Sequence, residues 1–459
     1  MAANRRSSSL LPFLLASALP LFHSVPVFAD IPWIVESPDP TVMGGADCSL
    51  VLDDQEVPHI AYYDAASGDL RYAVKAGVVW AIEDVDTLGN VGAGVTLRLD
   101  GNGNPHMMYL DRTDQTTWEW QIKYATRSGS PWSVEIAYSP GHTITEPEFV
   151  LDSSGRPHFV CGDIPGPYNR YGYKLGGSWF VEHVADSVSY TRGVDYSLAL
   201  DGMNRPHITY TESYSPSDLK LATKSDGAWS IETIATEGGR SVLVLDEAGS
   251  PRVAYYYYHL YYATQSGGAW SSELVDDLMY SGTKISLALD SQDRPHIAYA
   301  DSWGYWFDYA YKVGDVWSIE RSDDLESPGR NVSLVLDAMD NPHIGYSDGV
   351  SLAYAKTDIW AGVASVVQSR GAPSVWPSLT RGGPVWISMP DEFGQMLDVT
   401  VFDTAGREVK MLAESEGASP RGRGWNLTGM RGEYVAPGVY FLSVCTEKGS
   451  SVGKVILVR

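Results

Sequence analysis

Ile285-Ser-Leu-Ala-Leu-Asp290, followed closely by Arg294-Pro-His-Ile-Ala-Tyr299, is the stretch that decides the fold of this chain. Two short runs of β-forming residues flank a turn that begins at Asp290 and ends at Pro295. Apolar residues alternate along both runs, and this period of two is typical of strands rather than helices. The stretch therefore predicts a β-hairpin.

The same hairpin pattern occurs seven times along the chain. Each copy has a Leu-Asp pair and, five residues after the aspartate, a proline. The pairs are Asp53/Pro58, Asp100/Pro105, Asp152/Pro157, Asp201/Pro206, Asp246/Pro251, Asp290/Pro295 and Asp337/Pro342. No stretch shows sustained helical periodicity. Copies at one fixed internal spacing, built only from strands, predict an all-β fold and a seven-bladed propeller with one blade per repeat.

Two further strands are predicted after each hairpin. The third strand carries Leu-x-Tyr-Ala or a variant of it, as at Leu260 to Ala263. The fourth begins with Trp-x-x-Glu, as at Trp80/Glu83, Trp132/Glu135, Trp179/Glu182, Trp229/Glu232, Trp270/Glu273 and Trp317/Glu320. Four antiparallel strands make one blade of a propeller.

The seventh repeat lacks the end of this pattern. Trp360 is present, but no glutamate follows it at the expected position. The missing pattern occurs at Trp33-Ile-Val-Glu36, and Glu36 precedes Asp53 by the same 17 residues that separate Glu83 from Asp100. We therefore predict that this N-terminal segment is the outer strand of the seventh blade. Such pairing closes the ring and removes exposed sheet edges.

Residues 1–29 have the features of a secretory signal peptide. Arg5 and Arg6 provide the basic start, residues 10–21 are apolar, and Val27-Phe-Ala29 ends in a small residue. The apolar run is too short to span a membrane permanently, and no later segment is long and apolar enough. The sequence predicts cleavage after Ala29 and a soluble protein that is secreted or displayed on a bacterial cell surface.

Charge and cysteine content exclude some classes of partner and site. The chain has 33 basic and 57 acidic residues, a net charge of -24, which argues against nucleic acid or anionic lipid as a ligand. Cys48, Cys161 and Cys445 are an odd number and fall in non-adjacent repeats or outside the propeller. We interpret them as small core residues rather than as a disulfide framework. The pattern indicates no cofactor and no metal.

The C-terminal part of the chain is predicted to be a separate β-domain. The propeller is expected over 30–363, a linker over 364–380 and a small antiparallel sandwich over 381–459. Asp403-Thr-Ala-Gly-Arg407, Pro437-Gly-Val-Tyr-Phe441 and Lys454-Val-Ile-Leu-Val-Arg459 carry a resemblance. They resemble the C-terminal sorting domains of the type IX secretion system and the related Ig-like domains of flagellar hook-assembly type. The resemblance implies export machinery as a partner and a role in targeting or anchoring.

Several polar residues repeat in most blades and are interpreted as structural. His59, His106, His158, His207, His296 and His343 occupy one register of six blades, too far apart around a ring to share one ion. The acidic residues five positions after each histidine, Asp64, Asp111, Asp163, Glu212, Asp301 and Asp348, are predicted to cap loops. Asp100-Gly-Asn-Gly-Asn104 is predicted to form a turn, because Pro105 stands where a calcium loop needs glycine.

Candidate ligand-binding residues are those that do not repeat. The loop between the second and third strands varies in length, and variable loops on a rigid scaffold commonly bind ligands. These loops carry aromatic residues suited to sugar rings, although aromatics of this kind also pack between blades. The candidates are Trp118, Trp120, Tyr168, Trp303 and Trp306.

A second non-repeating register lies six residues before each Leu-Asp aspartate, where the innermost strand begins. It contains Asp47, Gly94, Glu146, Asp195, Arg240, Lys284 and Asn331. Acids gather in the early blades and bases in the fifth and sixth. Such a polarised mouth of the central channel can orient a polar ligand. The alternative is salt bridging around the ring.

The predicted function is binding of a glycan, or another extracellular ligand such as a protein, on the variable-loop face. The propeller resembles bacterial propeller lectins and sialidase-like folds in general plan. The Ser-x-Asp-x-Gly-x-x-Trp box of sialidases does not occur, and no catalytic residue can be assigned. A sialidase-like hydrolase or polysaccharide lyase with a central pocket, for instance using Glu146 with Asp195, is the alternative, and a protein-interaction platform a third.

Overall fold

The computed structural model consists of β-strands throughout the part of the chain that it describes. The described residues are 33–42, 47–164, 166, 168–184, 196–212, 218–277, 285–300, 307–314, 316–321, 331–347, 351–357, 374–376, 379–380, 385–388, 396–403, 408–412, 422–425, 438–446 and 449–457. The chain divides into two compact units, one spanning Phe28–Ser365 and one containing Val366–Arg459. The predicted signal peptide lies outside the described residues.

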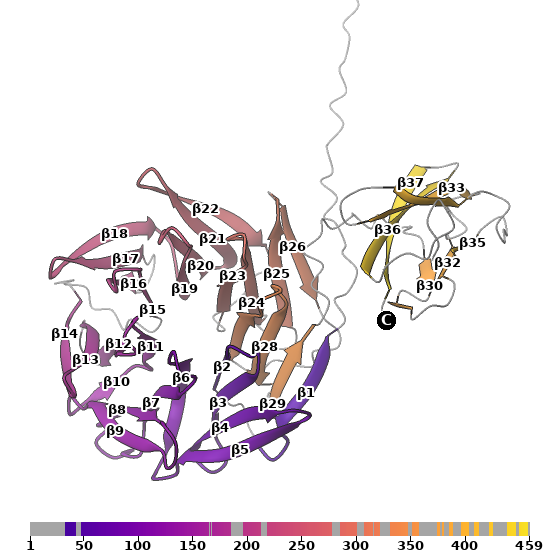
Figure 1. Cartoon of the computed structure of the whole chain (residues 1–459). Helices are drawn as coiled ribbons and strands as arrows, with labels where there is room; N and C mark the ends of the chain where they lie inside the picture. The colour runs from indigo at the N-terminus through magenta and orange to yellow at the C-terminus, as the bar shows by residue number, and fades with distance from the viewer. Residues whose placement is uncertain are drawn as a thin grey trace, which may run out of the picture. The chain divides into compact units, whose positions relative to one another are not determined.

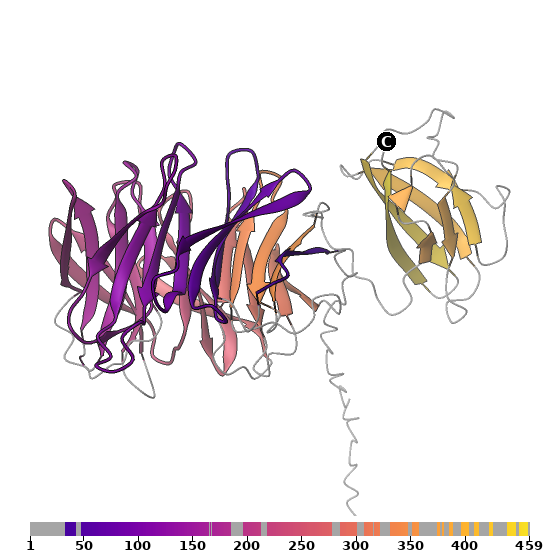
Figure 2. The ribbon, with the colours of Figure 1, turned by 90° about the horizontal axis from the view of Figure 1, so that it is seen from below.

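The larger unit is a propeller of seven antiparallel sheets arranged around a central axis (Figure 1). In six blades the chain runs from the innermost strand to the outermost, as the repeat predicts; blade 3 also has a short extra strand, β10 (Thr143–Ile144). Blade 1 consists of β2 (Cys48–Leu52), β3 (Pro58–Asp64), β4 (Asp69–Ala76) and β5 (Val79–Asp86), and blade 2 of β6 (Val91–Leu99), β7 (Pro105–Asp111), β8 (Gln121–Thr126) and β9 (Ser133–Tyr138). Blade 3 consists of β11 (Glu148–Leu151), β12 (Pro157–Ile164), β13 (Asn169–Leu175) and β14 (Ser178–His183), blade 4 of β15 (Ser197–Leu200), β16 (Pro206–Glu212), β17 (Asp218–Ser225) and β18 (Ala228–Ala235), and blade 5 of β19 (Ser241–Leu245), β20 (Pro251–Tyr257), β21 (His259–Ser266) and β22 (Ala269–Asp276). Blade 6 consists of β23 (Ile285–Leu289), β24 (Pro295–Ala300), β25 (Phe307–Val313) and β26 (Val316–Arg321), and blade 7 of β27 (Val332–Leu336), β28 (Pro342–Ser347), β29 (Leu352–Lys356) and β1 (Ile34–Asp39). Seen from the side, the strands of each blade run between the two faces of the propeller (Figure 2).

The seventh blade closes as predicted. Its sheet has the order β1-β29-β28-β27, so the N-terminal strand is the outermost one. Val35 pairs with Ala355 and Glu36 with Tyr354 in an antiparallel register. The two ends of the propeller sequence therefore meet in one sheet, and β29 is not left as an exposed edge.

The hydrophobic core lies between neighbouring blades. Side chains of the second and third strands pack between neighbouring blades, and Tyr72 and Tyr109 are fully buried between blades 1 and 2. The Tyr109 hydroxyl donates a hydrogen bond of 2.8 Å to Asp86 at the end of the preceding blade. The same contact joins Tyr62 to Asp39 across the closing seam, so the polar end of each ring is satisfied.

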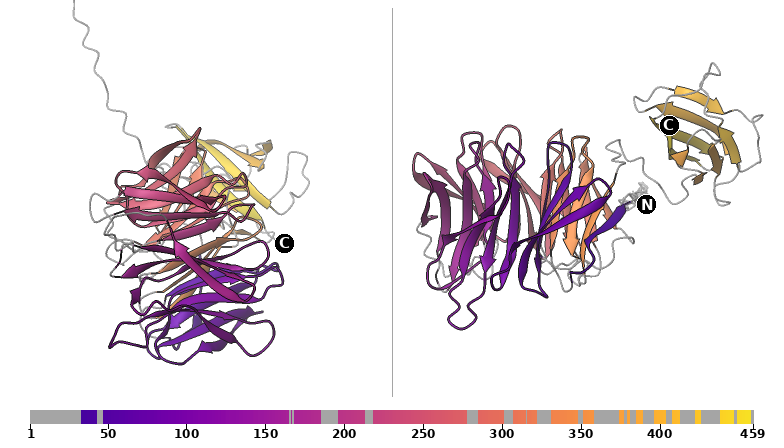
Figure 3. Two further views of the ribbon diagram at one scale, coloured as in Figure 1. Left: turned by 90° about the vertical axis from the view of Figure 1, so that its left-hand side faces the viewer. Right: turned by 60° about the horizontal axis from the view of Figure 1, so that its bottom comes forward.

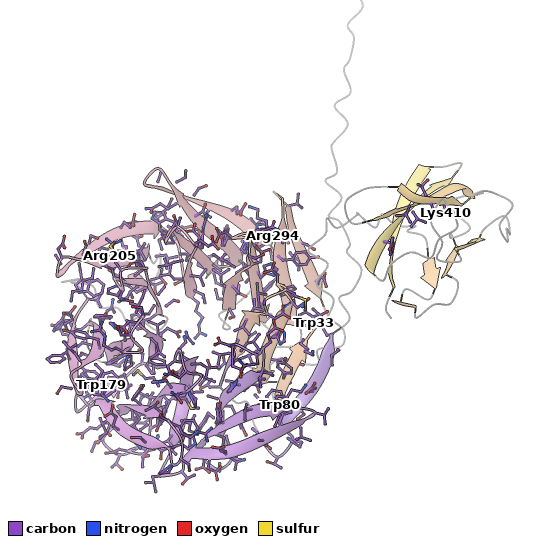
Figure 4. All side chains as sticks on the ribbon, viewed as in Figure 1. Trp33, Trp80, Trp179, Arg205, Arg294 and Lys410 are labelled. Atoms are coloured by element: carbon purple, nitrogen blue, oxygen red, sulfur yellow. The ribbon has the colours of Figure 1, made fainter. Side chains whose placement is uncertain are left out.

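The Trp-x-x-Glu motif joins neighbouring blades along the perimeter at five junctions among the described residues. The Trp80 indole donates a 3.0 Å hydrogen bond to Glu36, and the Lys75 ammonium pairs with the same carboxylate. Figure 4 labels Trp80 and Trp179 at two of these junctions. The tryptophan–glutamate pairs are Trp80–Glu36, Trp132–Glu83, Trp179–Glu135, Trp229–Glu182 and Trp270–Glu232. The motif is therefore an inter-blade contact.

A second ring of contacts joins the innermost strands. The serine four residues before the hairpin aspartate accepts a hydrogen bond from a backbone N–H of the next blade. Leu97 donates to Ser49 at 3.0 Å, and Leu50 donates to Ser333 at 3.0 Å across the closing seam. These contacts hold the walls of the central channel in a fixed register.

The smaller unit contains two sheets, in keeping with the predicted sandwich. One has the order β30-β32-β35, from β30 (Ser374–Trp376), β32 (Val385–Ser388) and β35 (Gly422–Trp425). The other has the order β31-β37-β36-β33-β34, from β31 (Leu379–Thr380), β37 (Gly449–Leu457), β36 (Gly438–Thr446), β33 (Met396–Asp403) and β34 (Glu408–Leu412). Val399 and Val401 of β33 are fully buried. Figure 3 shows the strands of this unit from two directions.

Two further sequence predictions concern cysteines and membrane segments. Cys48 and Cys161 are buried, as expected of small core residues, whereas the side chain of Cys445 lies outside the described residues. Burial raises the pKa of the Cys161 thiol well above its ordinary value. Within the described ranges, no helix has the length and apolar character needed to cross a membrane.

Candidate functional site

The repeated histidines bond within their own blades, as predicted. The imidazole Nδ1 of His158 lies 2.5 Å from the Tyr171 hydroxyl, and its Nε2 lies 3.5 Å from Asp152, the aspartate that starts the hairpin. In blade 4, Leu221 takes the place of the tyrosine and Thr223 contacts His207 instead. Burial lowers the pKa of five hairpin histidines, His59, His106, His158, His207 and His296, and favours the neutral ring. Among the described residues, no cluster of His, Cys, Asp or Glu is arranged to hold a metal ion.

Two of the acidic residues predicted to cap loops do so. Asp64 and Asp111 accept hydrogen bonds at 3.0 and 2.9 Å from the backbone N–H groups two residues further on. Asp163 differs, because it pairs with Arg170 at 2.6 Å and accepts a hydrogen bond from Tyr138. The side chains of Glu212, Asp301 and Asp348 lie outside the described residues.

The Asp100 segment is a turn, as predicted. The Asp100 carboxylate accepts the backbone N–H groups of Asn102 and Asn104 at 2.9 and 2.8 Å and the Asn104 side-chain amide at 2.9 Å. These hydrogen bonds lower the pKa of Asp100 to about 2, although its partial burial acts in the opposite direction. The carboxylate is therefore occupied by its own loop.

A cavity of about 390 Å³ lies at the centre of the propeller, lined by the innermost strands of all seven blades. Four residues of the predicted polarised register contribute to its lining: Gly94, Glu146, Arg240 and Asn331. Asp195 and Lys284 lie outside the described residues. The structure therefore brings several of the predicted residues to one cavity, although they come from separate blades.

Asp47 has a structural role at this mouth. Its carboxylate accepts the Gly94 backbone N–H at 2.8 Å and the Asn331 side-chain amide at 3.0 Å. Asp47 therefore links blades 7, 1 and 2. For this residue the alternative interpretation, bonding around the ring, describes the observed contacts.

Two charged residues inside the cavity were missed by the sequence analysis. Arg98 and Glu148 both line it, and their side chains approach to 3.4 Å. Arg98 also donates to the Leu97 carbonyl at 2.8 Å. Enclosure by protein lowers the pKa of Arg98, and Glu148 partly offsets that effect, while a third of the Arg98 side chain faces the cavity. The ion pair places a donor and an acceptor side by side on the cavity wall.

The sequence does contain a signal for this pair. Arg98 stands two residues before its hairpin aspartate, where the other blades have only apolar residues: Val51, Val150, Ala199, Val244, Ala288 and Val335. Glu148 stands four residues before its aspartate, where five blades have Ser or Thr. A charge at an inner-strand position that is otherwise apolar or small indicates a local function or a compensating pair.

Arg112 connects the aromatic loop of blade 2 to the cavity mouth. Its guanidinium donates to Glu146 at 2.7 Å and lies 5.1 Å from the centre of the Trp120 ring. Trp120 packs against the core between blades 2 and 3, and Trp118 contacts its ring with centroids 5.7 Å apart. Trp118 is 51% exposed. The predicted aromatic loop and the predicted polarised mouth are thus parts of one continuous surface.

The other predicted loop aromatics do not join this surface among the described contacts. Tyr168 is exposed, but its ring packs against His183 at 4.8 Å and under the Arg170 guanidinium at 5.4 Å, within its own blade. Trp303 and Trp306 lie outside the described residues. Trp118 is therefore the loop aromatic that is both exposed and connected to the mouth in the described part of the chain.

No protein-family model and no curated protein matches this chain. Among solved structures, it is similar to a Hadza microbial sialidase, with 12% identity over 63% of this chain and 73% of the sialidase and a TM-score of 0.44. It is also similar to the Aleuria aurantia lectin in complex with Fucalpha1-6GlcNAc, with 13% identity, 60% and 94% coverage and a TM-score of 0.42. PorZ, a surface component of the type-IX secretion system of Porphyromonas gingivalis, has 12% identity, 90% and 68% coverage and a TM-score of 0.36. Because all three TM-scores are low, function must be argued from this chain's own residues.

Proposed function

We propose that the propeller binds a glycan at the central cavity and the adjoining loop of blade 2. One sugar ring stacks on Trp118, and the next sugar places its hydroxyl groups at the Arg112–Glu146 pair. The observation that carries the proposal is the continuous path from an exposed aromatic ring, through Arg112, to a carboxylate that lines the cavity. Aromatic faces and precisely placed polar groups are the two elements of a carbohydrate site.

The size and chemistry of the cavity favour a small polar ligand. Its volume of about 390 Å³ falls within the range of roughly 300–1,000 Å³ that is typical of small-molecule sites. Each arginine–carboxylate pair offers fixed donors beside fixed acceptors, which matches the neighbouring hydroxyl groups of a sugar.

Glycoside hydrolysis at the same cavity is the second candidate. Glu146 and Glu148 both line it, and hydrolases use two carboxylates on either side of the scissile bond. One of the two carboxyl groups in such a pair must carry a proton. Both glutamates, however, are already engaged by arginines, Arg112 and Arg98, so acting on a substrate would require each to leave its ion pair. We therefore place binding ahead of catalysis.

The proposal is tested with a glycan array and the mature chain, residues 30–459. Wild-type protein should bind one class of glycan, and Trp118→Ala should weaken that binding about tenfold, or about 1.4 kcal/mol. Glu146→Gln, which removes the Arg112 ion pair, should weaken it by a similar factor. Tyr258→Ala is the matched control, because Tyr258 is also an exposed loop aromatic with a positive φ, on blade 5.

The array separates the alternatives by outcome. Equal loss of binding in Trp118→Ala and Tyr258→Ala, or silence across a broad array, contradicts the proposed site and favours a protein ligand. A signal that fades as the printed glycan is consumed identifies an enzyme. In that case Glu148→Gln should abolish the consumption.

We also propose that the chain is exported and that its C-terminal unit directs sorting. The signal-peptide pattern of residues 1–29 and the motif resemblance of residues 403–459 support this. Expression in a bacterium with a type IX system, with and without residues 381–459, tests it. Retention of the truncated chain in the periplasm is the expected result, and unchanged release would contradict the proposal.

A further inference from the structure

We propose that the cleft between blades 3 and 4 is a second ligand site, for an acidic sugar that carries a carboxylate or a sulfate group. The cleft has a volume of about 300 Å³. It is lined by Arg156, Tyr173 and Lys174 of blade 3 and by Arg205 and Lys224 of blade 4, among others. It is formed by the hairpin turns and third-to-fourth turns, and therefore opens on the face opposite the variable loops.

Both arginines of this cleft are held in place from behind. Arg156 Nε donates to Asp152 at 2.6 Å, and Arg205 Nε donates to Asp201 at 2.6 Å. The two aspartate side chains are 0% and 6% exposed, and their other oxygens accept backbone N–H groups of the hairpin turn. Each guanidinium is therefore fixed by one edge, which reduces the entropy lost when a ligand binds.

The opposite edge of each guanidinium is available to a ligand. Within the described part of the chain, neither arginine makes a hydrogen bond through Nη1 or Nη2. The side chains of Arg156 and Arg205 are 46% and 41% exposed. A guanidinium with two free N–H groups on one edge matches a carboxylate or sulfate in a bidentate geometry.

The remaining lining residues fit a sugar. Tyr173 lines the cleft and is stacked between His158 and Phe180, with ring centroids 6.0 and 5.5 Å apart. Tyr173 and His158 thus form an aromatic wall of the cleft beside the cationic groups. An acidic sugar has both features, a ring with apolar C–H faces and a charged substituent, whereas a simple anion needs only the second. The wall therefore favours a sugar acid or a sulfated sugar over an isolated anion.

A comparable cleft between blades 5 and 6 differs from the cleft between blades 3 and 4 in its exposure and its lining charges. It has a volume of about 340 Å³ and includes Arg294, anchored on Asp290 in the same way as Arg205 on Asp201. The Arg294 side chain is only 23% exposed, and two carboxylates, Glu273 and Asp293, join the lining. The cleft between blades 3 and 4 has one lining carboxylate, Asp226. Arg294 (labelled with Arg205 in Figure 4) is therefore a matched control.

Binding is measured by isothermal titration of the mature full chain with three oligosaccharides. The probes are oligogalacturonate, which carries carboxylates, chondroitin sulfate oligosaccharides, which carry sulfates as well, and neutral cello-oligosaccharides. We expect the wild-type chain to bind one or both acidic probes and to lose affinity as salt is raised. Arg156→Gln/Arg205→Gln should weaken binding at least tenfold, whereas Arg294→Gln should remain within twofold of wild type.

Two further variants serve as controls. Arg205→Lys keeps the charge and the contact with Asp201 but loses the second edge, so it should also weaken binding while the thermal unfolding midpoint stays near that of wild type. Trp118→Ala should leave binding of the acidic probes unchanged, because this site is independent of the central cavity.

Absence of binding to both acidic probes, or an equal loss in Arg294→Gln, overturns the proposal. Equal affinity for poly-glutamate and for the acidic sugars overturns the assignment to a glycan. Preference for one acidic probe supports the proposal and identifies the charged group.

Discussion

Trp33 is the residue on which closure of the propeller is expected to depend most. It immediately precedes β1 and is 8% exposed, within the core between blades 6 and 7. Its ring meets Tyr309 edge to face at a centroid distance of 5.7 Å. In the sheet, β1 has one paired neighbour, β29, and its side chains Glu36 and Asp39 also bond to blade 1. Figure 4 labels Trp33 at the seam.

The expected cost of Trp33→Ala follows from this burial. Replacing a buried aromatic residue by alanine typically costs about 3–5 kcal/mol. We expect the lower part of that range, about 3 kcal/mol, because an outer strand can relax into part of the space that is left. If β1 detaches, Glu36 no longer accepts the hydrogen bond from Trp80 or pairs with Lys75, and the seam between blades 7 and 1 is weakened as well.

The assay is guanidinium unfolding of the mature chain followed by circular dichroism. The C-terminal unit and the propeller need not unfold together, so the propeller transition is taken separately. Trp118→Ala serves as the control, because that side chain is half exposed and its loss should change the free energy of unfolding by less than about 0.5 kcal/mol.

A double variant tests detachment itself. If Trp33→Ala already frees β1, then Glu36→Gln should have no further effect in that background, although it destabilises the wild-type chain. Full additivity of the two changes would show that β1 stays in place without its tryptophan. A loss below about 1 kcal/mol for Trp33→Ala alone would refute the reasoning, since it falls well short of the cost of a buried aromatic residue.

Two other predictions concern pH and the cavity mouth. Burial lowers the pKa of His59, His106, His158, His207 and His296, so the unfolded chain binds protons that the folded chain does not. The stability of the fold should therefore decrease as the pH is lowered below about 6.5, the pKa of histidine in the unfolded chain. An unfolding midpoint that rises when the pH is lowered from about 7.5 to about 5.5 would contradict this. The hairpin aspartates, whose pKa values are lowered, should add a second loss of stability below about pH 3.8, extending to about 2 for Asp100. Gly94→Ala should weaken glycan binding, because a Cβ at this position would lie 2.5 Å from the Glu146 side chain. Gly103 also has a positive φ but open space around it, so Gly103→Ala should leave glycan binding unchanged and cost stability alone, about 1 kcal/mol.

The propeller could be predicted from the sequence because its signals are local and repeated. The spacing from Asp290 to Pro295 reports one hairpin, and its recurrence reports the number of blades. The interval from Glu36 to Asp53 predicts the closing strand, which pairs with β29 in the structure. The partner of the Trp-x-x-Glu motif could not be predicted in this way, because the bond from Trp80 to Glu36 joins different blades and depends on the distance between them.

The candidate site is less visible in the sequence for a physical reason. Whether a residue lines the central cavity depends on the side chains that face it from other blades. Those contacts depend in turn on where each innermost strand begins. Asp47 and Glu146 share a register, yet one is used to join blades and the other lines the cavity. Arg98 shares no register with either, although it lies in the same cavity.

The repeat therefore defines the scaffold, and departures from the repeat indicate where function is to be sought. In blade 2, Arg98 replaces an apolar residue and the loop after β7 carries Arg112, Trp118 and Trp120. In blade 3, Glu148 replaces a small hydroxyl residue. These departures face one another at the boundary of two blades, joined by two ion pairs, 3.4 and 2.7 Å long. The two charges of each ion pair come from different blades, so both repeats depart from the common pattern. The propeller scaffold alone does not require such a pair. The boundary of blades 2 and 3 is therefore the first place to look for a bound ligand.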